Sequence, residues 1–188
     1  MSSRPKFSVF IGPSKESVSL GDIDFDLDID IFQFVHTGDL KSIKIYVNNK
    51  NVIKIDKWGR TPLHFACRYG YLQIAKILVE NGADVNAKDN DGYTPLSESC
   101  DYGFIDIVKY LVEECSVDVN TKDKYKSSPV HTASFYGRLN MLKILVDNGA
   151  YLNRKDKFGY TPLDKARSKK HTDIVNYIKK KLKQGSKK

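Results

Sequence analysis

Three kinds of side chain in this sequence could take part in chemistry: histidine, aspartate and cysteine. Two of the histidines close similar four-residue runs, Thr61-Pro62-Leu63-His64 and Ser128-Pro129-Val130-His131. Four of the aspartates recur along the chain, namely Asp56, Asp89, Asp123 and Asp156. Histidine can bind a metal ion or act as a general base, and paired carboxyl groups can act as acid and base. Either chemistry requires side chains that converge on one point, so it depends on the elements that carry them.

The sequence repeats itself, and the repeat sets where these side chains lie. Gly59 recurs as Gly92 and Gly159, with Lys126 in the same place between them, at intervals of 33, 34 and 33 residues. The run that begins at Thr61 returns three times, as Thr94-Pro95-Leu96-Ser97, Ser128-Pro129-Val130-His131 and Thr161-Pro162-Leu163-Asp164. A period of this length is typical of one structural unit that stacks on its neighbours.

The repeat separates the reactive side chains from one another. His64 and His131 fall two repeats apart, and the recurring aspartates fall one to a repeat. A metal site needs several converging ligands, and acid/base work needs two carboxyl groups within roughly 10 Å. The sequence also lacks a phosphate-binding P-loop, a dinucleotide-binding G-x-G-x-x-G and a G-x-S-x-G run. We therefore predict no catalytic residue, no metal site and no cofactor, and we interpret the aspartates as turn residues.

The fixed period and the T-P-L-H-x-A core resemble the ankyrin repeat family. The resemblance covers about residues 30–182 and implies an all-α solenoid of helix-turn-helix units with short β-hairpin or turn fingers. It implies a partial first repeat at 29–55, full repeats at 56–88, 89–122 and 123–155, and a capping repeat at 156–182. Residues 1–28 are then an N-terminal tail, flexible or packed on the first repeat, and residues 183–188 are a basic tail.

Local signals within each repeat agree with two helices. Thr61 is a favourable N-cap and Pro62 a favourable first helical residue, so a short helix is expected up to Tyr69. Gly70 suits a left-handed helix end. A second apolar stretch then predicts a helix over residues 72–80.

Three departures from the repeat predict local differences. Residues 113–120 are one residue longer and lack the expected glycine, so the second helix of that repeat should end differently. Lys126 replaces a turn glycine, which predicts a strained or reshaped hairpin tip. Lys170 replaces the glycine between the helices of the last repeat, which suits a terminal unit that faces water.

Residues 22–30, DIDFDLDID, alternate strictly between acidic and apolar residues. This alternation is typical of an extended strand with Ile23, Phe25, Leu27 and Ile29 on one face. Two interpretations stay open. The segment could cover the apolar end of the solenoid, or it could be an acidic docking peptide.

The cysteines indicate a reducing compartment. Cys67 and Cys100 occupy equivalent places in adjacent repeats, where we expect buried, small apolar side chains. Stacked helices lie about 10 Å apart, whereas a disulfide needs Cα atoms within about 7 Å, so a bridge is disfavoured. The cysteine count is odd, at three, and no signal peptide or membrane span is recognisable. These features favour the cytoplasm, with the nucleus also open.

The resemblance implies a non-catalytic module, monomeric on its own, that binds another protein as an adaptor, scaffold or inhibitor. Ankyrin proteins bind partners through a concave face of first helices and through the hairpin tips. Spacing of three and four along each first helix, together with the tips, gives the candidates. They are Trp58, Arg60, Phe65, Arg68, Tyr69, Tyr93, Glu98, Asp101, Tyr102, Tyr125, Phe135, Tyr136, Phe158 and Lys169. The surface would begin aromatic and basic, turn acidic at Glu98 and Asp101, and end basic.

The C-terminal end offers an alternative function. The whole chain has a formal charge of +8, and residues 154–188 hold 13 Lys and Arg against 3 Asp and Glu. Such an end could contact nucleic acid, an anionic membrane or a nuclear import receptor, or it could be a solvated cap. The family resemblance also implies candidate hydroxylation sites at Asn86, Asn120 and Asn153.

Overall fold

The computed structural model describes residues 8–10, 17–19, 30–48 and 50–185, within two compact units, Met1–Asp30 and Ile31–Lys188. In the first unit, β1 (Ser8–Phe10) pairs antiparallel with β2 (Ser17–Ser19), with Val9 opposite Val18. The sequence analysis did not predict this hairpin. The alternating residues 22–29 lie outside the described residues.

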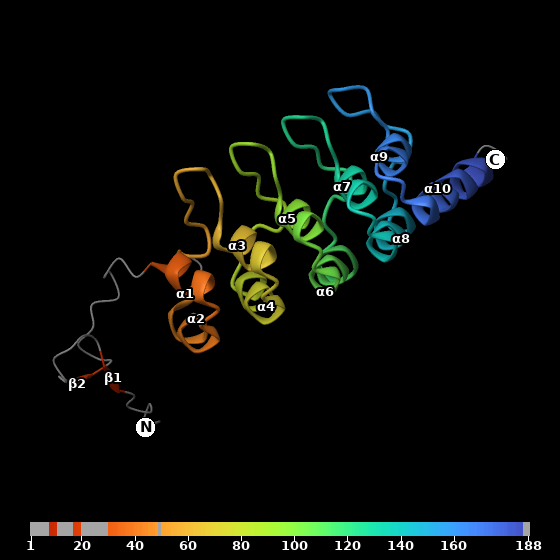
Figure 1. Cartoon of the computed structure of the whole chain (residues 1–188). Coiled ribbons are helices and arrows are strands. Elements are labelled where there is room, and N and C mark those ends of the chain that lie inside the picture. The colour runs from red at the N-terminus through yellow and green to blue at the C-terminus, as the bar shows by residue number, and fades with distance from the viewer. Residues whose placement is uncertain (1–7, 11–16, 20–29, 49, 186–188) are drawn as a thin grey trace. The chain divides into compact units, whose positions relative to one another are not determined.

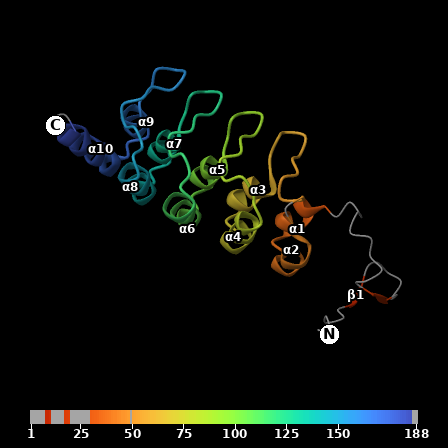
Figure 2. The ribbon, with the colours of Figure 1, turned by 180° about the vertical axis from the view of Figure 1, so that it is seen from behind.

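The second unit is an α-solenoid of helix pairs, as predicted (Figure 1). Each pair contributes one helix to each of two rows, and neighbouring helices within a row are in contact. The same two rows are seen from behind in Figure 2. The first row, beside the projecting loops, comprises α1 (Ile31–Thr37), α3 (Pro62–Tyr69), α5 (Pro95–Tyr102), α7 (Pro129–Phe135) and α9 (Pro162–Ser168). The second comprises α2 (Leu40–Tyr46), α4 (Leu72–Glu80), α6 (Ile105–Lys109) with the π-helix η1 (Tyr110–Glu114), α8 (Leu139–Asp147) and α10 (Thr172–Gly185).

The core runs along the stack between the two rows. Leu78, Leu111 and Leu145 of the second row and the small residues of the first helices are fully buried, and so are Cys67 and Cys100. Both are free thiols, as expected. Burial raises the pKa of the Cys67 thiol to about 12, so it is an inert apolar side chain at neutral pH.

The two motif histidines cap helices and hold the repeats together. The Thr61 N–H lies 3.1 Å from Nδ1 of His64, so Nδ1 accepts and Nε2 carries the proton toward the Tyr93 carbonyl, 3.0 Å away. His131 does the same between Ser128 and the Arg154 carbonyl, at 3.3 and 3.1 Å. The neutral His64 imidazole therefore joins its helix to the following repeat, and the His131 imidazole joins its helix to the chain segment that leads into the last repeat. No cluster of metal-ligating side chains occurs within the described residues.

The extra residue of the second repeat is absorbed by η1. In the first repeat, the Ala83 N–H donates to the Leu78 carbonyl, five residues back, whereas the Val117 N–H reaches Leu111, six residues back. A π-helix is a one-residue insertion in an α-helix, so Leu111 remains buried like Leu78. The predicted difference at the end of this helix is therefore confirmed.

Non-glycine residues that replace repeat glycines keep the left-handed backbone. Ser116, Lys126 and Lys170 have φ of 54°, 56° and 60°, and they are the non-glycine residues with positive φ in the described chain. The Lys126 N–H donates to the Asp123 carbonyl at 2.9 Å, the same bond that Gly59 makes to Asp56. The tip at Lys126 is thus strained but not reshaped.

The glycine between paired helices also leaves room for the next repeat. A Cβ built on Gly38 would lie 2.9 Å from the Tyr71 ring, and one on Gly137 would lie 2.7 Å from the His171 ring. Lys170 occupies this place in the last repeat, after which the structure describes no further helix pair. Only the cost of its left-handed backbone remains, so a lysine is tolerated there.

The last helix is longer than predicted. Residues 183–185, assigned from sequence to a loose basic tail, continue α10. Lys, Leu and Gln are good helix formers, and nothing breaks the helix before Gly185. Within α10, Lys181 forms an ion pair with Asp147 at 3.0 Å, which ties this end to α8.

Lowering the pH should destabilise the stack through the two capping histidines. Burial lowers the pKa of His64 and of His131, so folding favours the neutral rings. Their contribution is complete above the unfolded pKa of about 6.5 and is lost below it, by up to about 1.4 kcal/mol per pH unit for each ring. We expect the free energy of unfolding in urea to fall between about pH 7.5 and 5.5, above the range of ordinary carboxyl groups.

The chain offers its own replacement for the control. Ser97 occupies the histidine place in the second repeat, where its hydroxyl lies 3.1 Å from that of Thr94. A double variant with His64→Ser and His131→Ser should be less stable at the higher pH but should lose much less stability on acidification. An equally steep loss in the double variant would contradict the assignment.

Replacing Lys126 by glycine should stabilise the protein. A left-handed non-glycine residue costs about 1–2 kcal/mol, and glycine gives back roughly 0.5–1 kcal/mol through the entropy of the unfolded chain. We expect Lys126→Gly to raise the free energy of unfolding by about 0.5–1 kcal/mol. Lys122→Gly, in the same loop but without a positive φ, should lower it. Equal destabilisation by both changes would refute the strain argument.

Candidate functional site

The candidate site is the finger-and-helix surface, formed by the first-row helices α3, α5, α7 and α9 and by four projecting loops, the fingers (Figure 1). The fingers are residues 56–60, 89–93, 123–127 and 156–160. Each is built on its first aspartate: Oδ1 of Asp56 accepts from the N–H groups of Trp58 and Arg60, both at 2.9 Å. Asp89, Asp123 and Asp156 accept equivalent pairs at 2.8 or 2.9 Å. The predicted role of these aspartates as turn residues is confirmed.

Consecutive fingers are hydrogen-bonded to each other. In the second, third and fourth fingers, the first residue after the aspartate donates its N–H to a carbonyl of the preceding finger. The bonds run from Asn90 to Trp58 at 2.9 Å, from Lys124 to Asp91 at 2.8 Å and from Lys157 to Tyr125 at 2.7 Å. This series, the finger ladder, fixes the spacing of the tips and hence of the side chains that they present.

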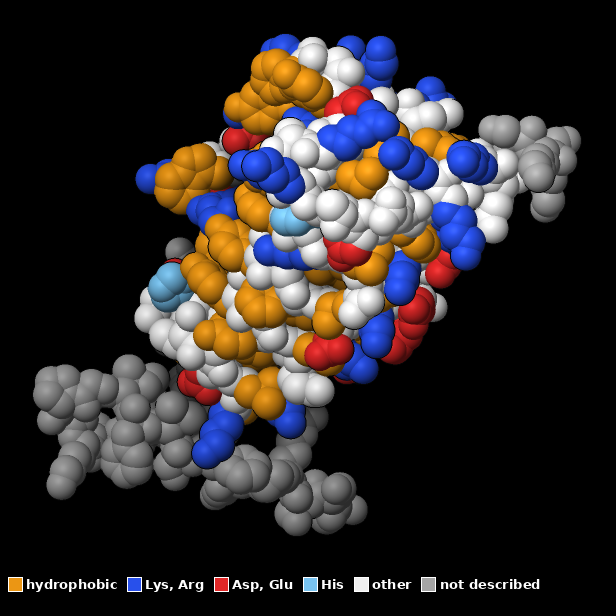
Figure 3. Space-filling model, turned by 45° about the vertical axis from the view of Figure 1, so that its right-hand side comes forward, with side chains coloured by type: hydrophobic (Ala, Val, Ile, Leu, Met, Phe, Trp, Pro, Cys, Tyr) orange, Lys and Arg blue, Asp and Glu red, His pale blue; other side chains and the backbone are white. Residues whose placement is uncertain are grey.

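Large aromatic side chains project from this surface into solvent. The exposed fractions lie between 39% and 64% for Trp58, Tyr102, Tyr125, Tyr136, Phe158 and Tyr160. Tyr125 and Phe158 stack across neighbouring fingers, with ring centroids 6.1 Å apart. On the face drawn in Figure 3, hydrophobic side chains lie interspersed with Lys and Arg. Exposed aromatic and Arg side chains are the types that contribute most to binding at protein interfaces.

Cations accompany the aromatic rings of the first finger. Nζ of Lys57 lies 4.1 Å from the Trp58 ring centroid, and the guanidinium of Arg60 lies 4.4 Å from it. Arg60 is also 4.5 Å from the Phe65 ring and is paired with Asp56 at 2.7 Å. These contacts orient Trp58 while half of its surface stays exposed.

Some predicted residues serve the contacts between repeats. The Tyr69 hydroxyl lies 2.9 Å from Nδ1 of His36 in the partial N-terminal repeat, and its ring packs edge-on against that imidazole. Phe65 packs edge-to-face on Phe32, with ring centroids 5.6 Å apart. Both predicted side chains are half-buried, so they shape the start of the surface more than they project from it.

The structure differs from the sequence analysis at Glu98. Its side chain is only 3% exposed and accepts two hydrogen bonds from the Arg68 guanidinium, at 2.9 and 3.1 Å. The predicted cation and carboxylate therefore neutralise each other across adjacent repeats. The spacing of three and four residues placed Arg68 and Glu98 on the same face of their respective helices, α3 and α5. It did not reveal that the packing of adjacent repeats buries the Glu98 carboxylate.

The acidic character of the middle therefore rests on Asp101. This side chain is half-buried, and no hydrogen bond or ion pair of its carboxylate occurs within the described residues. Burial first, and then the neighbouring Glu98, raise the pKa of the Asp101 carboxyl. Tyr93 is also half-buried, and burial raises the pKa of its hydroxyl.

The third and fourth repeats bring cations to the aromatic stripe. Nζ of Lys169 lies 4.4 Å from the ring centroid of Phe135, and the Arg138 guanidinium lies 4.8 Å from that of Tyr136. The sequence analysis missed Arg138. A signal was present, because Arg138 takes the place that Tyr71 and Phe104 hold in the earlier repeats, against an inter-helix glycine.

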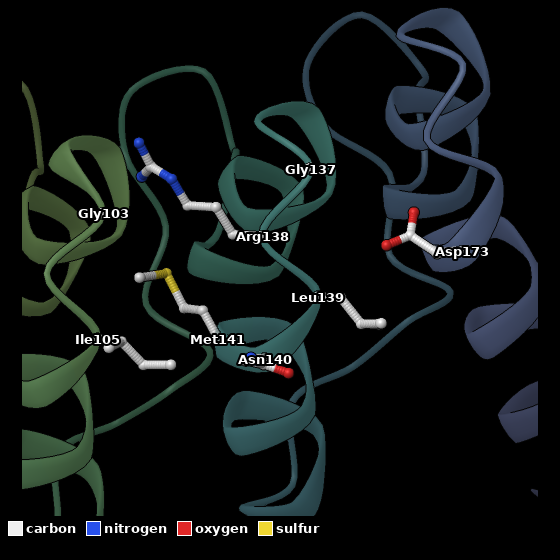
Figure 4. A pocket seen from close by; sticks show the side chains of 8 residues that line it. All are labelled: Gly103, Ile105, Gly137, Arg138, Leu139, Asn140, Met141 and Asp173. Atoms are coloured by element: carbon white, nitrogen blue, oxygen red, sulfur yellow. The ribbon is translucent and has the colours of Figure 1, made fainter.

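A cavity of about 500 Å³ lies away from the fingers, where α6, α8 and α10 begin (Figure 4). It is lined by Gly103, Ile105, Gly137, Arg138, Leu139, Asn140, Met141 and Asp173. The Arg138 guanidinium points away from Asp173 in this view. The lining brings together none of the predicted partner-binding residues.

Two of the three candidate asparagines make bonds between repeats. Oδ1 of Asn86 accepts from the Asp118 N–H at 3.1 Å. The Asn120 amide accepts from the Tyr151 N–H at 2.9 Å and donates to the Gly149 carbonyl at 3.1 Å. Asn153 is exposed. Hydroxylation stays a prediction at all three residues.

Comparison with known proteins identifies the type of repeat. Two family models match, ankyrin repeats in three copies over residues 31–123 and ankyrin repeats in many copies over residues 110–166. A Dictyostelium discoideum acyl-CoA-binding domain-containing protein 6 homolog is 37% identical over 90 residues, which cover 44% of this chain and 31% of that protein. No helix within the described ranges is long and apolar enough to span a membrane.

Two further relatives are similar over shorter stretches. An ankyrin repeat protein of fowlpox virus is 38% identical over 58 residues, or 30% of this chain and 41% of the relative. Mouse protein phosphatase 1 regulatory subunit 27 is 36% identical over 61 residues, which cover 32% of this chain and 40% of that protein. The chain thus spans less than half the length of each of these three relatives. The matched repeats and the stacked helix pairs show that the chain belongs to the ankyrin repeat family.

Proposed function

We propose that this protein is a non-catalytic interaction module that binds a partner protein on its finger-and-helix surface. Ankyrin repeats generally mediate protein–protein interaction, and this chain carries such repeats over most of its length. The observation that carries the proposal is the row of half-exposed aromatic side chains on that surface. Burying them in an interface would remove apolar area from water at about 25 cal/mol per Å².

The positions of these side chains favour binding over a structural role. Tyr102 and Tyr136 follow each other in adjacent repeats at the ends of α5 and α7, with 52% and 50% of their surfaces exposed. The core beneath them is complete without their rings, because apolar side chains of both rows already fill it. A regulatory or adaptor role agrees with the relative named as a regulatory subunit of protein phosphatase 1.

A second candidate function rests on the basic end. In α10, Lys179, Lys180 and Lys183 are exposed beyond Ile178, the last fully buried residue of the stack. A regular helix presents these charges together, which favours contact with an anionic surface. If the ligand is nucleic acid, the affinity for a labelled duplex must fall steeply with salt. An absent salt dependence would remove this candidate.

Removing either exposed tyrosine should weaken binding of the partner. The full chain is used for affinity capture with mass spectrometry, and the captured protein is then purified and titrated. We expect Tyr102→Ala and Tyr136→Ala each to cost about 1–2 kcal/mol, or roughly 5- to 30-fold in Kd. Neither change empties the core, so the unfolding transition should remain close to that of the wild type.

Tyr151 provides the matched control. It is 51% exposed, like the two test residues, but it follows α8 and lies outside the fingers and the first-row helices. Tyr151→Ala should leave the affinity unchanged. If Tyr151→Ala weakens the partner as much as the test variants, or if neither test variant weakens it, the surface is assigned incorrectly.

A further inference from the structure

We propose that the third and fourth fingers form a basic edge that binds an acidic segment of the partner protein. The basic edge comprises residues 122–127 and 154–160. The inference rests on the proposed function and makes it more specific, since it names what the partner presents to this part of the surface. The two fingers lie side by side (Figures 1 and 2) and are joined by the bond from the Lys157 N–H to the Tyr125 carbonyl at 2.7 Å.

The basic edge carries more positive charge than its own acids can neutralise. It holds six Lys and Arg, all exposed, against two Asp. Both aspartates are turned into their own fingers. Oδ1 of Asp123 accepts from the N–H groups of Tyr125 and Ser127, at 2.8 and 2.9 Å. Asp156 is also paired with Lys165 at 2.6 Å, and its side chain is only 1% exposed. The charge that this edge presents to solvent is therefore that of its cations.

A contact within the chain shows how a carboxylate is held on these fingers. Nζ of Lys124 donates to the Asp91 carboxylate of the second finger at 2.6 Å, which is a charge-assisted bond. One repeat further on, Lys157 occupies the place of Lys124, and Tyr125 occupies the place of Asp91. The third finger thus has a ring where the second has a carboxylate, so a partner carboxylate can pair with Lys157.

Lys126 adds an argument from the backbone. It holds a left-handed conformation, with a φ of 56°, at the place where the other three fingers have glycine. A lysine is less favourable than glycine in this conformation, and the side chain of Lys126 is exposed. Strained backbone positions cluster at binding sites. A contact between the Lys126 ammonium and the partner accounts for a lysine at this place.

The aromatic side chains of the basic edge favour a protein segment over a nucleic acid. Base stacking needs free ring faces. Tyr125 is stacked on Phe158 and has Nζ of Lys124 5.2 Å from its ring centroid. Nζ of Lys165 lies 5.1 Å from the centroid of Tyr160. These ring faces are in part occupied, whereas the exposed parts of the rings can pack against apolar side chains of an acidic protein segment.

The test titrates the full chain into a fluorescein-labelled acidic peptide, EEDEFDEE, and follows the fluorescence anisotropy. The matched control peptide, QQNQFNQQ, keeps the side-chain lengths and the phenylalanine but has no charged side chain. We expect the acidic peptide to bind and the control peptide not to bind. The affinity for the acidic peptide should fall between about 50 and 300 mM salt, because the charges on both sides are exposed.

Three variants locate the contact. Lys157→Glu replaces an attraction by a repulsion and should weaken the acidic peptide about tenfold. Lys126→Gly should weaken it about threefold although the same change stabilises the protein, so the loss cannot come from unfolding. Lys143→Glu, at an exposed place on α8 in the second row, makes the same change in net charge as Lys157→Glu. It should change the affinity by less than about twofold.

Several outcomes would overturn the inference. Equal binding of both peptides, or an equal loss in Lys143→Glu and Lys157→Glu, would show that the basic edge recognises no carboxylate of its own. An oligothymidylate that displaces the peptide and binds more tightly, with the same sensitivity to Lys157→Glu, would assign the edge to nucleic acid.

The captured partner separates this inference from the proposed function. We expect the acidic peptide to compete with the partner, and Lys126→Gly to weaken the partner as it weakens the peptide. Partner binding that is lost in Tyr102→Ala and Tyr136→Ala, but is unaffected by the peptide and by Lys126→Gly, would refute this inference and leave the proposed function standing.

Discussion

One constraint underlies the structure: a single helix pair of this size cannot bury its own apolar side. Each pair obtains its core from the next, so Leu63 and Leu78 are fully buried because the stack continues on either side of them. The polar bonds obey the same constraint. The His64 imidazole reaches the carbonyl of Tyr93, one repeat further on, and the fingers bond in series. Stability is therefore a property of neighbouring repeats, whereas the side chains between these contacts vary freely.

This division explains where function is expected. The buried positions, the finger aspartates and the left-handed positions recur because stacking needs them. The exposed positions of the fingers and first-row helices recur in every repeat, but different side chains occupy them. The third residue of the finger, for example, is Trp58, Tyr125 or Phe158. A surface that is rigid in backbone and variable in side chains suits recognition of one protein partner, because little conformational entropy is lost on binding.

The sequence was sufficient for the fold and for part of the site. Period, N-caps and glycines placed the helices of the second unit, including α4 at residues 72–80. The contacts between repeats could not be predicted from the sequence. The repeat pattern shows which helix face a residue occupies, but it does not show how much of that side chain the neighbouring repeat covers. Glu98 is the clearest case. It lies on the same face of α5 as the exposed Tyr102, yet its side chain is buried and paired with Arg68 of the preceding repeat. The sequence likewise left open whether the tip at Lys126 is strained or reshaped. The left-handed backbone of Lys126 and its N–H bond to the Asp123 carbonyl show that the turn keeps its shape.

The most direct test of the central claim is whether one end of the stack responds to a cavity near the other. Leu145, in α8, is fully buried, and Trp58, the single tryptophan, reports on the first finger. Leu145→Ala should cost about 2–5 kcal/mol. Urea unfolding followed by Trp58 emission should then shift together with the transition seen by far-ultraviolet circular dichroism. A Trp58 transition that stays in its wild-type place while the helical signal shifts would show that the repeats fold independently, and would contradict the account.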